Sequence, residues 1–310
     1  MLPESKTTFK ELADWYLNLK SIKKLKSYKR ICVALGQFNA VFGQQVVNTI
    51  KPEELEDYQE KRLEGGKTPA TVDMELSIAK TMITKALDND KVGAHALKAF
   101  RRIKRKLKRG SNSRDRKLSF EEYKKLLDTS PPHLEAILIV AFNTGMRKGE
   151  ILNLKWENID RKKGFIRLTP DSTKEAKTKS IPINHHVAEV LDNLARAIHH
   201  DYVFTYHRKP IGEDLRTALQ NACDAAGITY GQKEKDGFRF HDIRTTVKTN
   251  MLRAGLDKAL RDTILGHSLE GTDAFYLKPT EEDLKEAMGK YTQWLDGQLD
   301  SASVDQNIRG

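Results

Sequence analysis

The sequence predicts a mainly α protein with one small antiparallel sheet, divided into two domains. Apolar residues recur at helical spacing over most of the chain, and only short segments at 165–168 and 181–183 look like strands. A dense run of basic residues separates the two halves. At 310 residues the chain is too long for one typical compact domain and long enough for two.

Residues 1–100 are predicted to form a helical domain. Phe9, Leu12 and Tyr16 share one face of a helix near the start of the chain. Pro52 suits the first position of a later helix, and the two acidic residues after it suit the positive end of the helix dipole. Gly65 ends that helix, and an apolar stripe from 68 to 88 predicts the next one. We expect several helices and no strand here.

The segment 101–117 is predicted to be a basic linker between the domains. It holds ten Lys or Arg and one acid, a net charge of +9 out of +11 for the whole chain. Charge this concentrated is typical of a segment that binds nucleic acid, although a solvated flexible linker also accounts for it. Gly110 and the polar residues after it break any helix. The residues expected to contact the nucleic acid are Arg101, Arg102, Lys104, Arg105, Lys106, Lys108 and Arg109.

Residues 118–296 are predicted to form the second domain. Ser119 and Glu122 make a capping box that opens it, and an apolar helix from 134 to 142 stops at Gly145. The polar stretch between the two short strands reads as a hairpin. The chain is helical again from 215 to about Trp294, and residues 297–310 look like a polar tail.

Composition and motifs exclude several classes of protein. The mean hydropathy is −0.61, and no apolar stretch approaches the roughly 18 residues of a membrane helix. The start of the chain lacks a secretory signal, so we expect a cytoplasmic protein. Cys32 and Cys223 lie far apart and suggest neither a disulfide framework nor a zinc site. The adjacent histidines at 185–186 and 199–200 should not share a helix face, so we expect no metal site. We also expect no cofactor.

The motifs that suggest chemistry are weak when each is taken alone. Arg147 could cap a helix, and Lys174 could be a solvated turn lysine. His267 could be a histidine beside a helix C-cap, and Tyr276 could be a core residue of an amphipathic segment. A single HxxR, here at 241–244, is unremarkable in a chain of this composition. Their order along the chain is what carries information.

Taken together, these motifs resemble the tyrosine recombinase (phage integrase) family. The stretch from Thr144 to Leu154 resembles the family's first signature, in which a glycine turn presents an arginine. A hairpin lysine, the HxxR, and Leu265-Gly266-His267 follow in the family's order. Tyr276 stands nine residues after His267, which is the family's spacing. The resemblance covers about residues 117–296, and the helical first half more loosely.

The resemblance implies an enzyme that cuts and rejoins DNA strands through a 3′-phosphotyrosine intermediate. Tyr276 would be the nucleophile, and Arg147 with Arg244 would clamp the phosphate. The planar guanidinium fork grips two phosphate oxygens at once, and it neutralises charge that builds in the transition state. A phenol, with an ordinary pKa near ~10, needs such cations to become a nucleophile.

Four further residues have implied roles. His241 lies three residues before the HxxR arginine and so shares its helix face, which suits a general acid or base. His267 would donate a hydrogen bond to the same phosphate, and Glu150 would hold the first arginine. Lys174 would protonate the leaving 5′ oxygen, although Lys177 and Lys179 lie near it and remain alternatives.

The resemblance also implies partners and a mode of assembly. Family members close two domains around duplex DNA like a clamp and act as a homotetramer on paired recombination sites; a monomer off DNA is compatible with this. No cofactor is needed, because the phosphotyrosine bond conserves the energy of the broken strand. We expect the integrase of a phage or another mobile element, associated with the nucleoid of a prokaryotic host. The alternatives are an Xer-like chromosome-dimer resolvase, a type IB topoisomerase and a non-catalytic DNA-binding protein.

Overall fold

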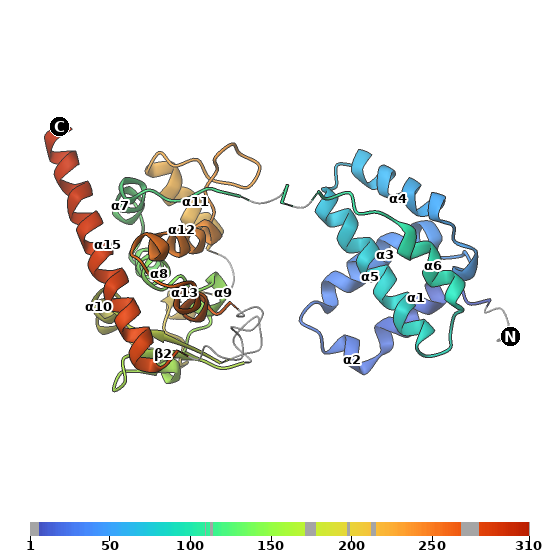
Figure 1. Cartoon of the computed structure of the whole chain (residues 1–310), viewed down its shortest axis with the longest axis horizontal. Coiled ribbons are helices and arrows are strands. Elements are labelled where there is room, and N and C mark those ends of the chain that lie inside the picture. Colours follow the sequence, from blue (N-terminus) through green and yellow to red (C-terminus); the bar gives the residue numbers. More distant parts are fainter. Residues whose placement is uncertain are drawn as a thin grey trace. The chain divides into compact units, whose positions relative to one another are not determined.

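The computed structural model describes residues 6–108, 110–111, 114–170, 178–196, 199–211, 215–267 and 279–309. The chain divides into two compact units, Met1–Arg114 and Asp115–Gly310. Figure 1 shows unit 1 in blue to blue-green and unit 2 in green to red. None of the described helices is long and apolar enough to span a membrane.

Unit 1 is built of helices around one aromatic centre. Phe38 stacks on Phe9 with ring centroids 5.5 Å apart and lies 4.4 Å from the ring of Tyr58. Aromatic pairs of this kind stabilise a core beyond the area that they bury. Thr8 forms a capping box with Glu11 at the first helix. The elements are α1 (Phe9–Asn18), α2 (Lys20–Lys23), α3 (Tyr28–Phe42), η1 (Val47–Thr49), α4 (Pro52–Glu64), α5 (Pro69–Leu87) and α6 (Ala94–Arg102).

The basic segment does not leave unit 1 where the sequence suggested. Its first two arginines end α6, and the chain then stays bound to unit 1. The buried carboxylate of Asp73, on α5, accepts the backbone N–H groups of Lys106 at 2.8 Å and Leu107 at 3.0 Å. Gln59 donates to the carbonyl of Lys104 at 3.1 Å. The expectation that the linker begins at residue 101 is therefore wrong, because these long-range hydrogen bonds hold the backbone through residue 107.

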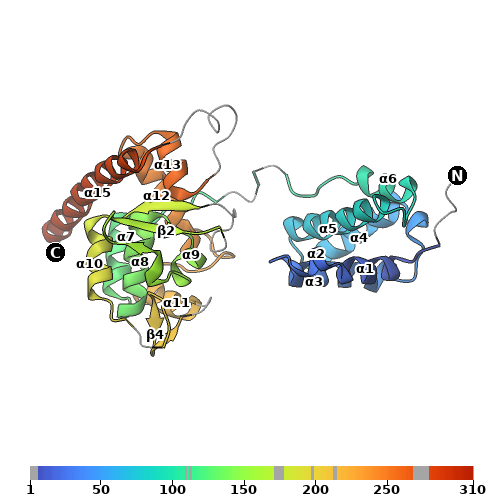
Figure 2. The ribbon, with the colours of Figure 1, turned by 90° about the horizontal axis from the view of Figure 1, so that it is seen from below.

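Unit 2 packs helices around an apolar helix and a small sheet. The central helix α8 (Pro132–Thr144) is buried and has apolar side chains on nearly every face. Helices α10 (His185–Asn193) and α12 (Phe240–Arg253) pack against it (Figures 1 and 2). The helices are α7 (Phe120–Asp128), α8 (Pro132–Thr144), α9 (Lys148–Leu152), η2 (Trp156–Asn158), α10 (His185–Asn193), α11 (Arg216–Ala225), α12 (Phe240–Arg253), α13 (Lys258–Leu265) and α15 (Glu281–Arg309).

The sheet of unit 2 is antiparallel in the order β1-β2-β3, with strands Ile159–Asp160, Phe165–Leu168 and Lys179–Pro182. Phe165 pairs with Pro182, and Leu168 pairs with Lys179. A second, two-stranded sheet joins β4 (Thr205–Tyr206) to β5 (Lys209–Pro210), which the sequence did not predict. The expectation of a mainly helical chain with a small antiparallel sheet is confirmed.

The last helix is longer than the sequence indicated. α15 runs from Glu281 to Arg309, so residues 297–309 of the expected tail are helical, and the expected end near Trp294 is wrong. A polar stretch does not by itself end a helix, and Gly297 here remains helical. Tyr291 is fully buried and donates its hydroxyl to the carbonyl of Phe142 at 2.9 Å, which fixes α15 to α8.

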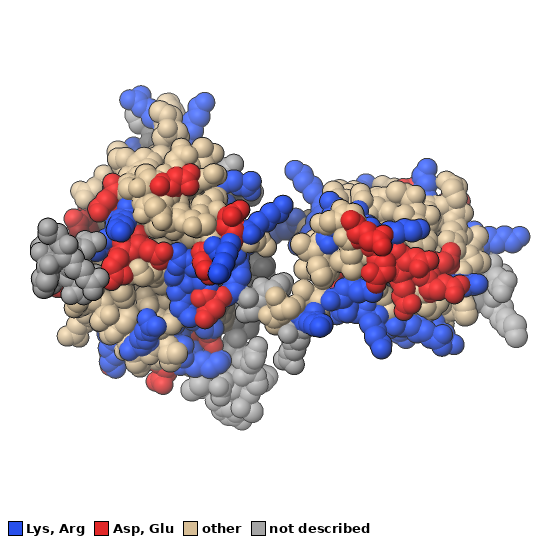
Figure 3. All heavy atoms as spheres, turned by 90° about the horizontal axis from the view of Figure 1, so that it is seen from above, with Lys and Arg blue, Asp and Glu red and all other residues tan. Residues whose placement is uncertain are grey.

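Charge is unevenly distributed on both units. On the face of unit 1 drawn in Figure 3, acidic side chains form a cluster that basic side chains border. On the face of unit 2 in the same view, Lys and Arg side chains gather in a patch with a few carboxylates beside it. Such patches are typical of proteins that bind polyanions.

Candidate active site

A glycine turn after α8 positions the first arginine. Gly145 ends α8 in the left-handed region, with φ of +63°, which favours glycine. A Cβ at this position would also overlap the side chain of Leu265 and approach Val247 to 3.1 Å. The chain therefore turns sharply against α12 and α13 before Arg147 begins α9. This is the physical reason for glycine in the Thr-Gly-Met-Arg stretch.

Glu150 holds Arg147 at the start of α9. One carboxylate oxygen accepts the backbone N–H of Arg147 at 3.0 Å, and the other accepts the guanidinium Nη1 at 2.9 Å. Glu150 is only 4% exposed. Burial opposes its ionisation, but the neighbouring Lys179 and the hydrogen bonds from Arg147 outweigh that, so the pKa of Glu150 lies below its ordinary value. The carboxylate is charged at neutral pH.

Arg244, in the first turns of α12, is buried and binds two separate loops. Its Nη1 donates to the carbonyl of Gly145 at 2.8 Å, and its Nη2 donates to the carbonyl of Leu265 at 2.5 Å. The first carbonyl lies two residues before Arg147, and the second lies two residues before His267. Arg244 therefore ties the turn that precedes Arg147 to the end of α13, which precedes His267.

His241 lies one helical turn before Arg244. Asp242 accepts the backbone N–H of Arg239 at 2.9 Å, which starts the helix at this point. Partial burial and the adjacent Arg244 lower the pKa of His241 below its ordinary value. The imidazole is therefore neutral at pH 7 and can accept a proton from a hydroxyl.

His267 follows the left-handed glycine that ends α13. Gly266 has φ of +71°, and the backbone N–H of His267 donates to the carbonyl of Asp262 at 2.7 Å. The ring Nδ1 lies 3.2 Å from Oδ1 of Asp262, which fixes the orientation of the ring. Burial lowers the pKa of His267 despite this carboxylate. Because Nδ1 is held by Asp262, Nε2 is the ring atom left to face a phosphate, and it donates a hydrogen bond to it when the imidazole is protonated.

Lys179 is the site residue whose importance sequence reasoning missed. Its side chain is 3% exposed, and its Nζ lies 3.0 Å from Glu150 Oε2. Burial lowers the pKa of Lys179 to about 8, with Glu150 opposing that change and Arg244 adding to it. The signal was present in the strand pattern, because Lys179 and Ile181 alternate onto the same buried face of β3.

Four expected residues lie outside the described part of the chain: Lys174, Lys177, Tyr276 and Arg109. The structure therefore brings together five of the seven expected catalytic residues, namely Arg147, Glu150, His241, Arg244 and His267. The two outside, Lys174 and Tyr276, stay predictions.

A hollow of about 810 Å³ opens beside Arg147 and His241. Sequence reasoning did not single out its other basic residues, which come from α9, α11 and the start of α12. Cations on several walls of one hollow suit a polyanion that passes through it. The basic residues around the hollow are Arg147, Lys148, Arg216 and Arg239.

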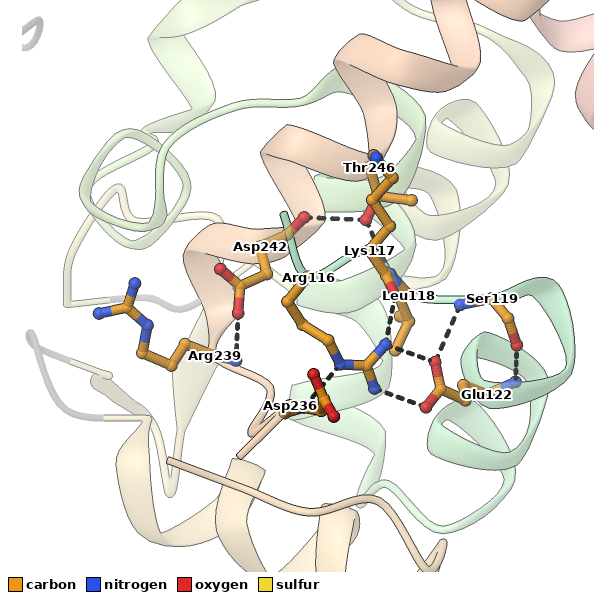
Figure 4. Close-up of polar contacts among 9 residues, drawn as sticks. All are labelled: Arg116, Lys117, Leu118, Ser119, Glu122, Asp236, Arg239, Asp242 and Thr246. Atoms are coloured by element: carbon orange, nitrogen blue, oxygen red, sulfur yellow. Dashed lines mark hydrogen bonds and ion pairs between the residues drawn. The ribbon is translucent and has the colours of Figure 1, made fainter. Parts of the chain in front are cut away.

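The chain enters unit 2 directly against the helix that carries the HxxR (Figure 4). The backbone N–H of Leu118 donates to Thr246 Oγ1 at 2.9 Å, and that hydroxyl donates to the carbonyl of Asp242 at 2.8 Å. Arg116 pairs with Glu122 and donates to the carbonyl of Asp236 at 2.9 Å. The end of the basic segment is therefore anchored to α12 and to the loop before it.

A second cluster, distant in sequence from these residues, could hold a metal ion. Nε2 of His186 lies 2.7 Å from Asp296 Oδ1, and Nε2 of His185 lies 3.9 Å from Asp296 Oδ2. The ligand atoms all lie within 4.8 Å of one another. Adjacent histidines were not expected to share a helix face, but α15 brings Asp296 to both rings.

Comparison with known proteins gives a consistent picture. Residues 116–282 match the family model described as "Phage integrase family". The chain is 32% identical over 178 residues to the tyrosine recombinase XerA of Pyrococcus furiosus, covering 55% of this chain and 60% of that protein. It is 30% identical over 164 residues to the integrase of Salmonella phage P22, covering 49% of this chain and 40% of that protein. The aligned region thus spans about half the length of these relatives.

Two solved structures share the fold. One is a dimer of lambda integrase residues 75-356 bound to a COC′ core site, with a TM-score of 0.68 and 18% identity; it covers 88% of this chain and 99% of that one. The other is a Tn1549 transposon integrase bound to circular intermediate DNA, with a TM-score of 0.63 and 15% identity; it covers 91% of this chain and 99% of that one. Because the family model spans more than half of the sequence, the chain belongs to the phage integrase family.

Proposed function

We propose that the chain is a site-specific DNA recombinase that cleaves and rejoins strands through a 3′-phosphotyrosine bond. It serves as the integrase of a phage or another mobile element. The observation that carries the proposal is the convergence of two arginines and two histidines on one site, with Arg244 bound to the loops that carry Arg147 and His267. The two guanidinium groups suit a phosphodiester whose negative charge grows during attack, and the two imidazoles suit proton transfer and hydrogen bonding.

The proposed reaction conserves the bond energy of the strand. The Tyr276 oxygen forms a bond to the scissile phosphorus and loses its proton, for which neutral His241 is a suitable acceptor. The bond to the 5′ oxygen breaks, and Lys174 gives that oxygen its proton. A 5′ hydroxyl from a second DNA end then attacks the phosphorus, and the bond from phosphorus to the Tyr276 oxygen breaks, which restores a phosphodiester. Lys174 takes the proton of the attacking hydroxyl, and His241 returns a proton to the tyrosine. No cofactor enters this sequence of steps.

The proposed partners are double-stranded recombination sites. Units 1 and 2 would close around the duplex as a clamp, and four copies would assemble on two paired sites. A lambda integrase tetramer has been solved on a Holliday junction. The match to the XerA recombinase supports a second candidate function, the resolution of chromosome dimers. Both candidates use the same chemistry and differ in their DNA target.

The test is to sequence the DNA that the protein traps covalently in its host. Cells are lysed in SDS, and protein-linked 3′ ends are captured and mapped. An integrase leaves ends at the borders of a mobile element and at one chromosomal attachment site. A resolvase leaves ends only at a chromosomal site, in cells with or without such an element. Absence of any protein-linked DNA, with the protein present and folded, contradicts the proposed chemistry.

The basic segment is expected to contact the DNA backbone. Five of its cations are exposed: Arg105, which pairs with the carboxylate of Asp73, and a further four, Arg101, Arg102, Lys104 and Lys108. Replacing all four by glutamine should weaken binding to every DNA sequence alike. The slope of log Kd against the logarithm of the salt concentration should also fall by up to roughly 3.6, because each phosphate contact contributes about 0.9 to that slope.

The matched control removes four exposed lysines elsewhere: Lys51, Lys61, Lys285 and Lys290. The net charge of both variants is equal, so long-range attraction falls equally. Binding titrations at several salt concentrations give the slope. An equal change of slope in both variants would show that the segment makes no phosphate contacts of its own.

Lys174 is expected to be the proton donor for the leaving 5′ oxygen. Lys174→Ala should slow cleavage strongly, and a substrate with sulfur at the bridging 5′ position should restore the rate. A thiol has a pKa of about 8.5, so a thiolate leaves without a proton, whereas an alkoxide does not. Rescue of Lys177→Ala by the same substrate, with none for Lys174→Ala, would assign the role to Lys177.

A further inference from the structure

We propose that Lys179 is a positioning residue whose ammonium group neutralises Glu150, so that the positive charge of Arg147 remains available to the DNA phosphate. This inference rests on the proposed function. Its basis is the shared carboxylate: Lys179 and Arg147 approach the same buried side chain from β3 and from the start of α9.

The geometry gives one carboxylate two cationic partners. Lys179 Nζ lies 3.0 Å from Oε2 of Glu150, and Arg147 Nη1 lies 2.9 Å from Oε1. The side chains of Lys179 and Glu150 are each 3% exposed, while that of Arg147 is 19% exposed. The carboxylate and the lysine are therefore enclosed by protein, and the arginine reaches toward solvent.

The net charge of Arg147, Glu150 and Lys179 determines how strongly the group attracts a phosphate bound at Arg147. A pair of Arg147 and Glu150 alone has no net charge, which suits a structural ion pair but not a phosphate clamp. Adding the Lys179 ammonium makes the group +1. Charges that are enclosed by protein are screened less than charges in water, so this difference reaches a phosphate bound at Arg147.

The aliphatic part of Lys179 supports the opposite side of the site. A Cβ on Gly266 would lie 2.9 Å from Lys179 Cδ and 3.2 Å from Cε, so the stem lies directly against the turn that precedes His267. The adjacent carbonyl of Leu265 accepts a hydrogen bond from Arg244. Lys179 thus contacts the loop that presents His267 as well as the carboxylate that holds Arg147.

Lys179 is not placed to be the proton donor. Its ammonium is directed to Glu150, and the charged groups that face it are that carboxylate, Arg147 from the start of α9 and Arg244 from α12. A donor must reach the leaving oxygen, whereas a buried ammonium bound to a carboxylate acts through its charge. The two roles give different outcomes in an experiment.

The main test measures single-turnover cleavage by the full chain at saturating DNA. Lys179→Met keeps the stem and removes the charge, and we expect it to slow cleavage about ten- to hundred-fold, the size expected for one unit charge near the phosphate. Glu150→Gln added to Lys179→Met removes the uncompensated carboxylate. The double variant should therefore cleave at least about ten-fold faster than Lys179→Met. Equal rates in the single and double variants would overturn the proposal.

A pH profile separates the charge from packing. The ratio of the wild-type rate to the Lys179→Met rate should fall toward one as pH rises from 7 to 9. The wild-type ammonium loses its proton through its pKa of about 8, and the methionine has no charge to lose. Dividing the two rates cancels the ionisation of the tyrosine. A ratio that stays constant would mean that Lys179 only fills space.

Two controls keep the outcomes distinct. Circular dichroism checks folding, and if Lys179→Met does not fold, the double variant replaces it in the pH comparison, where a constant ratio again counts against the proposal. A substrate with bridging 5′ sulfur should not rescue Lys179→Met; rescue would make Lys179 the proton donor instead. If the wild-type chain itself forms no adduct, the proposed function fails, whereas wild-type cleavage with an unaffected Lys179→Met refutes only this inference.

Discussion

Replacing Tyr276 by phenylalanine is expected to abolish the SDS-resistant adduct with DNA and leave DNA binding unchanged. The substitution removes the one atom that forms the bond to phosphorus and keeps the ring. Among the described site residues no side chain is expected to take over, because the arginines and histidines lack a hydroxyl nucleophile. Labelled DNA with a nick next to the scissile phosphate traps the adduct, and denaturing gels measure it.

Tyr291 provides the matched control for this experiment. It is the tyrosine next along the chain, but it is fully buried, and its hydroxyl donates to the carbonyl of Phe142 at 2.9 Å. Burial raises its pKa above the ordinary value, which makes the phenolate still harder to form. Tyr291→Phe should therefore keep the adduct while lowering the free energy of unfolding by about 1 kcal/mol. An adduct that persists in Tyr276→Phe at the wild-type level would remove that residue from the mechanism.

Local patterns predicted the parts of the fold that depend on local structure. The helix ending at Gly145 and the capping box at Ser119 are both present, because glycine φ preference and capping act within a few residues. The family resemblance was equally accessible, since the motifs are short and ordered. The placement of Arg147 beside Glu150 could be expected for the same reason, because the two residues are neighbours on one helical turn.

Features that depend on distant residues could not be predicted. The strand pattern places Lys179 on the buried face of β3, but its partner Glu150 comes from 29 positions away and is known only from the fold. The basic segment reads as a free linker until Asp73 accepts its backbone N–H groups. Asp296 meets His186 across 110 positions. In each case a carboxylate far along the chain decides what a basic group does, and charge composition alone contains no such information.

Replacing Arg244 by alanine is expected to affect catalysis and stability together, unlike Arg147→Ala. Arg244 is 5% exposed and satisfies the carbonyls of Gly145 and Leu265, so its loss leaves two buried acceptors without that donor. We expect a loss of roughly 1–3 kcal/mol in the free energy of unfolding. The segments before Arg147 and before His267 would also lose the residue that joins them, so the side chains of Arg147 and His267 would be held less firmly.

The expected loss in single-turnover cleavage rate is at least about 10²–10³-fold for either arginine, the size seen when one donor to a developing oxyanion is removed. Arg147→Ala should destabilise the fold less, because Glu150 keeps its ion pair with Lys179 at 3.0 Å. Urea unfolding and single-turnover cleavage on the same preparations separate the two effects, and binding titrations show whether affinity changes.

Arg244→Lys retains a charge but cannot bridge both carbonyls and a phosphate, so its cleavage should stay slow. If Arg244→Lys restored full cleavage, charge alone would be sufficient at this position. If Arg147→Ala proved the less stable of the two alanine variants, the assignment of Arg244 as the tie between the two loops would be wrong.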